Sequence, residues 1–556
     1  MPDGEAVRAV VKLQYMAAEP GAANDGHTSL LEGWEYPADE PMLDGPVCRR
    51  LAVVDFDPDS GAVQAGAPFQ PPNRSRKLGR YSIADESDSD SAHFRQVSVF
   101  GAVMKMIDMF EEADVLGRKL RWAFSGEQLL VVPQAGTMQN AFYHRGSRSL
   151  QFFSFDDSKT PGAKVHTCLS PDIVAHEATH AILDGIAPDL YDATSPQALA
   201  IHEAVADIGA VMFALRSRRL REQVLEMTGG DLKQSNAFNK IAQQFGEAVY
   251  GPGRPLRDLT NDRTMATAPN EPHELSEVLT GALYSVLVQL HDEAVEERLA
   301  AVRSTRLSAS GFELNSSANR LKRLAFRGLD YLPPGEVSFA DYGRAIVAAD
   351  TSSNPHDHHL RNRAKDAFVA REIVASGAEL DSVLPPEFVL PADLDLDLLL
   401  RSDLAAYQFC ERFRAEMMIP PGVSFEVRPR LDVTKLTFQG VEEVAYTHEL
   451  ILKVGWRESK VTRLIPGLVE EVSVMYGTTL AINWDERRIC GLVSTSPRDA
   501  SQMTPAARTH DDMRVAFLKQ GFESGLFEIG GPNVQLQGQT LRLKATGQML
   551  HMMTEA

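Results

Sequence analysis

The sequence predicts an α+β protein in which a mainly helical region lies between two regions rich in strands. Three observations lead to this class. Residues 91–117 and most of residues 170–378 carry apolar side chains at helical spacing. Residues 120–155 and several runs after residue 399 instead alternate polar and apolar side chains. At 556 residues the chain is also too long for one compact core, so several domains are expected.

Composition excludes some partners. The chain is 44% hydrophobic and 24% charged, as in soluble globular proteins. The formal net charge is -20, and a chain this acidic is repelled by nucleic acid and by anionic membranes. Neither is therefore predicted as a partner. The first residues lack the pattern of a secretory signal, and no apolar run has the length of a membrane span. A cytoplasmic protein is expected, and its oligomeric state is not indicated.

Shifts in composition divide the chain into four predicted parts. Residues 1–85 mix short strand-like runs with loops rich in proline and glycine, and form an N-terminal extension. Residues 86–378 form the main domain. Residues 379–398, with prolines and alternating acids, are typical of a linker, and residues 399–556 form a strand-rich α+β accessory domain.

The stretch IVAHEATHAILDGI, residues 173–186, carries a metal-binding pattern on a predicted helix. Residues four apart share one helix face, so His176 and His180 can present two imidazoles to one cation, with Glu177 beside them. Zinc is commonly held by two imidazoles and a carboxylate, and the adjacent glutamate can accept a proton from water. The short motif alone leaves a helix with unrelated polar side chains as an equal alternative.

The next helical pattern, ALAIHEAVADIGAVMFAL at residues 198–215, supplies a third ligand. Glu203 offers a carboxylate after a turn of suitable length. Asp207, four residues later on the same face, can orient a ligand histidine through its other ring nitrogen. Both acids lie among alanine, isoleucine, valine and glycine, which argues against the alternative of a solvated face.

These two helices resemble the active-site helix pair of the thermolysin-like zinc metallopeptidases, with H-E-x-x-H followed by E-x-x-x-D. The resemblance implies a Zn²⁺ cofactor, with Glu177 as general base. It implies zinc ligands at His176, His180 and Glu203, and a partner for a ligand histidine at Asp207. Tyr191, eleven residues after the second histidine, stands where the family has a tyrosine that helps to hold the oxyanion.

Three distant segments strengthen the resemblance. MQNAFYHRGS is similar to the family's edge strand, which implies that Asn140 and Ala141 bind an extended peptide. GEAVYGPGRPLRDLTND resembles the loop with a substrate-binding arginine, here Arg257. EPHELSEVLTGALYSVL resembles the segment with the catalytic histidine, here His273, which donates to the developing oxyanion.

The resemblance spans about residues 85–378 and implies a two-lobed peptidase domain, with a β-rich N-terminal lobe and an α-helical C-terminal lobe. Ile173 and Leu256 are expected to line an apolar pocket for the side chain that follows the scissile bond. The implied function is that of a zinc-dependent endopeptidase that acts on peptide or protein substrates. The accessory domain and the N-terminal extension lie outside the resemblance.

The chain departs from the family pattern at two positions near the predicted site. His202 stands where the family usually has asparagine, which is either a peripheral change or a competing imidazole near the metal. Ala268 replaces the aspartate expected five residues before His273. Asn270 and Glu271 are the candidates to orient that histidine instead.

A third departure concerns calcium. Asp172 and Glu247 match two acids of the calcium cluster found in secreted members of the family, but Ala242 and Gln244 occupy positions where acids are expected. So few carboxylates would hold a hard cation weakly, and the family's double calcium site is predicted to be absent.

Two alternatives to an active peptidase remain. The main domain is either a catalytically weak or inactive metallopeptidase-like scaffold whose C-terminal domain mediates binding, or a zinc hydrolase with a non-peptide substrate. The first predicts zinc content without peptide cleavage, and the match to a peptide-binding edge strand argues against the second.

Overall fold

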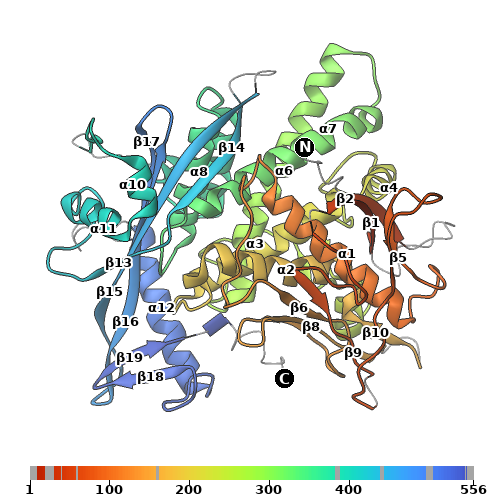
Figure 1. Ribbon diagram of the computed structural model, residues 1–556. Coiled ribbons are helices and arrows are strands. Elements are labelled where there is room, and N and C mark those ends of the chain that lie inside the picture. Colours follow the sequence, from red (N-terminus) through yellow and green to blue (C-terminus); the bar gives the residue numbers. More distant parts are fainter. Residues whose placement is uncertain are drawn as a thin grey trace, which may run out of the picture.

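In the computed structural model of the chain (Figure 1), the described residues are 9–18, 31–38, 40–57, 60–157, 162–381, 388–438, 444–495, 505–544 and 546–547. Helices and strands both contribute, so the predicted α+β class is confirmed. Strand-rich segments come first, a long helical part follows, and a second strand-rich part comes last. The predicted linker is described only in part, because residues 382–387 lie outside the described residues.

Two four-stranded sheets form the N-terminal part. The first has the strand order β2-β1-β5-β4. Its strands are β1 (Ala9–Met16), β2 (Leu31–Ala38), β4 (Phe69–Gln70) and β5 (Gly79–Tyr81). Helix α1 (Ala92–Glu111) packs against β1, and its Ser98 accepts a hydrogen bond from the backbone of Met16 at 3.0 Å.

The second sheet has the order β3-β6-β8-β7, so that β7 lies at an edge. Its strands are β3 (Leu51–Val53), β6 (Leu129–Val132), β7 (Ala141–His144) and β8 (Ser149–Phe152). A hairpin of β9 (Ser154–Asp156) and β10 (Lys164–His166) follows. Because β3 pairs with β6, the division predicted at residue 85 runs through one shared sheet.

The helical part lies at the centre of the molecule (Figure 1). Its helices are α2 (Pro171–Ile186), α3 (Pro196–Leu215), α4 (Arg218–Thr228), α5 (Gln243–Tyr250), α6 (Pro272–Ala301), α7 (Arg306–Arg327), α8 (Phe339–Ser353) and α9 (His359–Ala370). The short strands β11 (Lys240–Ile241) and β12 (Arg257–Asp258) pair with each other. The 3-10 turns are η2 (Thr167–Leu169), η3 (Pro188–Leu190), η4 (Gly328–Tyr331) and η5 (Gly377–Leu380).

Helix α3 is the central helix of this part. Among the described residues it is the one helix with the length and apolar composition of a membrane span, and 100% of its apolar window is buried inside the molecule. Burial on all sides explains its apolar composition, as in the core of a soluble protein.

The C-terminal part is built on a seven-stranded sheet, here called the C-terminal sheet. Its path is β13-β15-β16-β19-β18, with β14 paired to β15 and β17 to β16. The strands are β13 (Phe425–Val427), β14 (Leu431–Phe438), β15 (Val444–Ile465), β16 (Val469–Asn483), β17 (Arg488–Ser494), β18 (Val534–Gln537) and β19 (Thr540–Leu543). The helices α10 (Leu396–Arg401), α11 (Asp403–Arg412) and α12 (Pro505–Glu523) accompany it.

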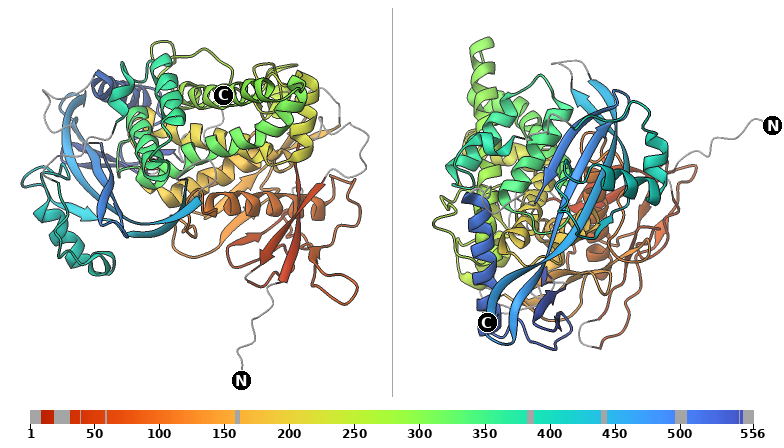
Figure 2. Two further views of the ribbon diagram at one scale, coloured as in Figure 1. Left: turned by 90° about the horizontal axis from the view of Figure 1, so that it is seen from above. Right: turned by 90° about the vertical axis from the view of Figure 1, so that its left-hand side faces the viewer.

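The C-terminal sheet has its own hydrophobic core but is joined closely to the helical part. Trp456, Val472 and Leu541 belong to this second core, and Leu199 of α3 is buried in it as well. The sheet curves against the helical part (Figure 2). Buried Asp330 pairs across this junction with Lys435 at 3.0 Å. The four predicted divisions of the chain stay predictions.

Candidate functional site

The three helices that carry the predicted site residues begin with the same local signal. α2, α3 and α6 each have proline at the first helical position, after Ser170, Ser195 and Glu271. The side chain of each of these capping residues accepts a hydrogen bond from a backbone N–H group in the first turn. Such caps fix the start of a helix and therefore the direction of the side chains that follow.

Helices α2 and α3 pack closely, which brings their polar faces together. At Gly209 of α3, an added Cβ would lie 2.2 Å from Oγ1 of Thr179 on α2. A larger residue there requires Thr179 or its helix to shift, so this glycine permits the close approach of the two helices.

His176, His180 and Glu203, here called the ligand triad, converge on one point. The two Nε2 atoms lie 2.9 Å apart. Glu203 approaches the Nε2 atom of His176 at 3.5 Å and that of His180 at 3.6 Å. A tetrahedral cation with bonds of about 2.0–2.1 Å has ligand atoms about 3.3 Å apart. The triad therefore has donor atoms of suitable type and spacing to hold a metal ion.

The other ring nitrogens of the two histidines are engaged outside the triad. Nδ1 of His176 lies 3.1 Å from Oδ1 of Asp207, so His176 is the ligand histidine that Asp207 contacts. Nδ1 of His180 lies 2.6 Å from Nδ1 of His202, and the two rings stack with centroids 4.8 Å apart. His202 therefore contacts His180 on the side away from the triad. A partner of this kind fixes the ring orientation and leaves Nε2 to bind a metal.

The charge around the triad favours a cation. Burial lowers the pKa of His176, but hydrogen bonds with Asp207 and Glu203 outweigh it and raise this pKa to about 10. Buried carboxylates thus stabilise positive charge at this point. The same two carboxylates also attract the guanidinium of Arg257, which lies 3.9 Å from both Glu203 and Asp207.

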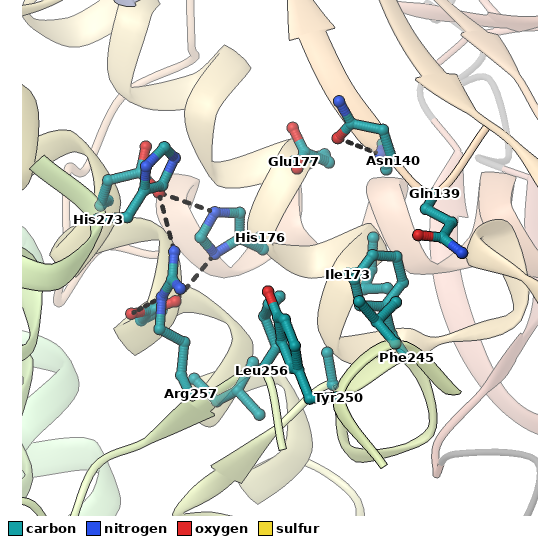
Figure 3. A pocket seen from close by; sticks show the side chains of 16 residues that line it. Gln139, Asn140, Ile173, His176, Glu177, Phe245, Tyr250, Leu256, Arg257 and His273 are labelled. Atoms are coloured by element: carbon teal, nitrogen blue, oxygen red, sulfur yellow. Dashed lines mark hydrogen bonds and ion pairs between the residues drawn. The ribbon is translucent and has the colours of Figure 1, made fainter. Parts of the chain in front are cut away.

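A pocket of about 320 Å³ opens beside the triad (Figure 3). Its polar end includes Glu177, Arg257 and His273 together with the triad members His176 and Glu203. Its apolar end is lined by Ile173, Ile241, Phe245, Val249, Tyr250 and Leu256. The structure therefore brings the two predicted apolar residues, Ile173 and Leu256, to the same pocket.

Four lining residues of the apolar end were not predicted from the sequence: Ile241, Phe245, Val249 and Tyr250. A signal for two of them was present, because Phe245 and Val249 are four residues apart and share one face of α5. Ile241 lies in β11 before that helix and Tyr250 is the last residue of the helix, where no periodic pattern marks them.

Glu177 lies at the polar end of the pocket, next to the edge strand β7. Its Oε2 atom accepts a hydrogen bond of 2.8 Å from the backbone N–H of Tyr143. The side chain is 5% exposed, and Asn140 and Ala141 line the pocket beside it. Oδ1 of Asn140 accepts a hydrogen bond from the Ala141 N–H at 2.8 Å (Figure 3).

His273 is oriented by Glu271, one of the two predicted candidates. Nδ1 of His273 lies 2.7 Å from Oε1 of Glu271, and Oε2 of the same carboxylate caps α6 through the Glu274 N–H at 2.9 Å. Burial opposes the charge of His273, but Glu203 and then Glu271 raise its pKa above the ordinary value. The other candidate, Asn270, donates instead to the backbone of Met513 on α12 at 2.8 Å.

Tyr191 is not among the residues that line this pocket. Its ring is 1% exposed and packs against the rings of Tyr143 and His202, with centroids 5.8 and 5.9 Å away. Arg145 lies over the ring at 4.3 Å. The hydroxyl is buried without a hydrogen-bond partner among the described residues, and burial raises the pKa of Tyr191. Of the predicted catalytic residues, Glu177 and His273 meet at the pocket, while Tyr191 lies apart from it.

The region that matches the family's calcium cluster is used differently. Asp172 is buried, which raises its pKa to about 7, and its carboxylate accepts a hydrogen bond of 3.1 Å from the backbone N–H of Ala242. Glu247 accepts from Gln243 within α5 at 2.8 Å. The predicted absence of a double calcium site stays a prediction.

Comparison with known proteins does not assign this site. No model of a known protein family matches the chain. No curated protein matches it either. The function therefore has to be inferred from the geometry of the residues themselves.

Proposed function

We propose that this protein is a zinc-dependent endopeptidase with a thermolysin-like, two-lobed peptidase domain. The observation that carries the proposal is the convergence of His176, His180 and Glu203 beside a pocket that also holds Glu177 and His273. When bound, a zinc ion supplies a Lewis acid for the scissile carbonyl and makes a water molecule more acidic.

Glu177 is the proposed general base. Glu177 follows His176 in the chain and lines the pocket, and its carboxylate is held by the Tyr143 N–H, so it can accept a proton from water in the pocket. The same carboxyl group then donates that proton to the leaving amine. A positioned base of this kind contributes about 10²–10⁴-fold to the rate.

His273 is a proposed donor to the oxyanion, and Arg257 is proposed to bind the substrate. Both line the pocket, and Glu271 fixes the ring of His273 so that Nε2 faces the triad, 3.8 Å from Oε2 of Glu203. Donors that are held in place before the reaction stabilise charge as it develops. Tyr191 remains a predicted oxyanion donor that would have to become accessible to a substrate.

An extended peptide is the proposed substrate. Among the described strands β7 pairs only with β8, so an extended peptide can be added at its other edge, where it competes with the bonds that the Ala141 and Tyr143 N–H groups make to Asn140 and Glu177. The apolar end of the pocket, with Ile173, Phe245 and Leu256, suits an apolar side chain directly after the scissile bond.

A peptide-library digest followed by mass spectrometry tests this function and its specificity. We expect cleavage before leucine, isoleucine, phenylalanine and valine, lost on addition of a zinc chelator. Replacing Leu256 with Asp should lower kcat/KM for these peptides by at least about tenfold, because it places a charge in the apolar end of the pocket. Chelator-resistant cleavage, or no cleavage by zinc-loaded protein, would contradict the proposal.

A further inference from the structure

The N-terminus of α3 is held by a carboxylate from another part of the chain. Oε1 of Glu336 accepts hydrogen bonds from the backbone N–H of Thr194 at 2.7 Å and from its hydroxyl at 2.6 Å. Oε2 accepts from the N–H of Ser195 at 3.0 Å. Glu336 is 6% exposed, so these bonds are shielded from water. A buried carboxylate at this end of α3 satisfies backbone donors and opposes the positive end of the helix dipole.

The position of Glu336 is set by the C-terminal sheet. Its backbone N–H donates to the carbonyl oxygen of Met475 on β16 at 3.0 Å. Oγ1 of Thr479, also on β16, donates to the carbonyl of Leu332 at 2.8 Å. Between these two contacts, β16 lies directly against the loop that carries Glu336. A Cβ added at Gly477 of β16 would lie 2.6 Å from the carbonyl oxygen of Pro334 in that loop.

Further contacts tie the same end of α3 to the C-terminal part. Leu199 of α3 is buried in the second core. Arg428 binds Asp189 in the turn before α3 at 2.9 Å, and the N–H of Gly547 donates to the carbonyl of Tyr191 at 3.1 Å. The ring of Tyr191 in turn packs against His202.

The metal centre depends on this end of α3. Glu203 lies two turns into the helix, and His202 beside it contacts Nδ1 of His180. A tilt of α3 would move both Glu203 and His202 relative to the two histidines on α2. Metal binding requires donor atoms placed to within a few tenths of an ångström, so it is sensitive to such a tilt.

From these contacts we propose that Glu336 is a positioning residue for the metal centre, and that the C-terminal sheet holds Glu336 in place. The accessory domain is then part of the metal-binding unit rather than a separate binding module. This inference rests on the proposed function only in requiring that the ligand triad binds zinc.

Zinc affinity of purified full-length variants, measured by competition with a chromogenic chelator, tests the proposal. Glu336→Gln places an amide NH₂ group opposite backbone N–H donors, so at least one of the three bonds is lost. We expect its zinc Kd to rise about tenfold or more, as for other groups that orient metal ligands. Thr194→Val, which removes only the hydroxyl bond, should give a smaller rise.

Two glycine variants separate the role of the sheet from general destabilisation. Gly477→Ala pushes β16 against the loop that carries Glu336, and should also raise the zinc Kd. Gly521→Ala is the matched control, because its Cβ would lie 2.2 Å from the Phe527 ring in the second core and its nearest contacts are to that ring, not to the loop that carries Glu336. It should lower the free energy of unfolding and leave the zinc Kd of the folded protein within about twofold of wild type, because distant sites act independently.

The outcomes are distinct. A wild-type zinc Kd in folded Glu336→Gln would overturn the role of Glu336. A raised Kd in Glu336→Gln with a wild-type Kd in Gly477→Ala, or an equal rise in Gly521→Ala, would overturn the role of the sheet. Failure of wild-type protein to bind zinc would instead contradict the proposed function itself.

Discussion

Replacing Glu177 with glutamine is expected to lower kcat for peptide hydrolysis by about 10²–10⁴-fold, while zinc stays bound at one ion per chain. Glutamine has nearly the same shape and can still accept the hydrogen bond from the Tyr143 N–H through its amide oxygen. It cannot accept a proton from water. Steady-state kinetics on one peptide, with zinc content measured on the same sample, gives both values.

The control for this variant is Glu222→Gln, a glutamate on α4 that pairs with Arg218 at the surface. Its kinetics should match the wild type. Retained activity in Glu177→Gln would rule out Glu177 as the general base. Loss of zinc together with activity would show that the residue supports the metal centre rather than proton transfer.

Replacing Glu203 with alanine is expected to abolish activity through loss of zinc. The carboxylate is one of three ligands, and it also balances the positive charge that the site favours at His176. We expect the zinc Kd to rise by more than about 100-fold, beyond the 10–100-fold effect of a residue that only orients a ligand. Zinc content after exhaustive dialysis, followed by chelator competition, measures this change.

Asp207→Asn is the matched comparison for Glu203→Ala. Asp207 contacts Nδ1 of His176 and is not in the triad, so its loss should weaken zinc binding by about 10–100-fold without abolishing it. An equal effect of the two variants, or no loss of zinc in Glu203→Ala, would contradict the assignment of Glu203 as a ligand.

Helical periodicity is a local property, so the sequence could indicate which side chains of each helix share a face. The spacing of His176 and His180 places them on one face of α2, and the apolar surroundings of Glu203 and Asp207 indicate that α3 is buried. The approach of α3 to α2 could not be read from periodicity, since it depends on contacts such as that of Gly209 with Thr179.

Features that depend on contacts distant in the chain were harder to predict. The pairing of β3 with β6 joins segments that no local pattern connects, so the boundary at residue 85 was placed within a shared sheet. The burial of Tyr191 beside Tyr143 and His202 is likewise set by packing. Tyr191 occupies the sequence position of the family's oxyanion-binding tyrosine. That resemblance did not predict that its side chain lies apart from the pocket.

Glu336 shows a further limit of the sequence. It lies 133 residues after Glu203 in a loop without a motif, and its role arises only because β16 fixes that loop. The contact between Glu271 and His273 is local, in contrast to that of Glu336. Glu271 lies two positions before His273 in the chain, so it could be named as one of two candidates to orient that histidine.

The central claim is that His176, His180 and Glu203 bind a catalytic zinc ion. The most direct measurement is a titration of metal-free protein with zinc, in which peptide hydrolysis and bound zinc are followed together. Activity should rise linearly and reach its maximum at one zinc ion per chain, and His180→Ala should show neither stoichiometric zinc nor activity. Zinc bound at one per chain without hydrolysis would point to an inactive scaffold, and hydrolysis independent of zinc would contradict the claim.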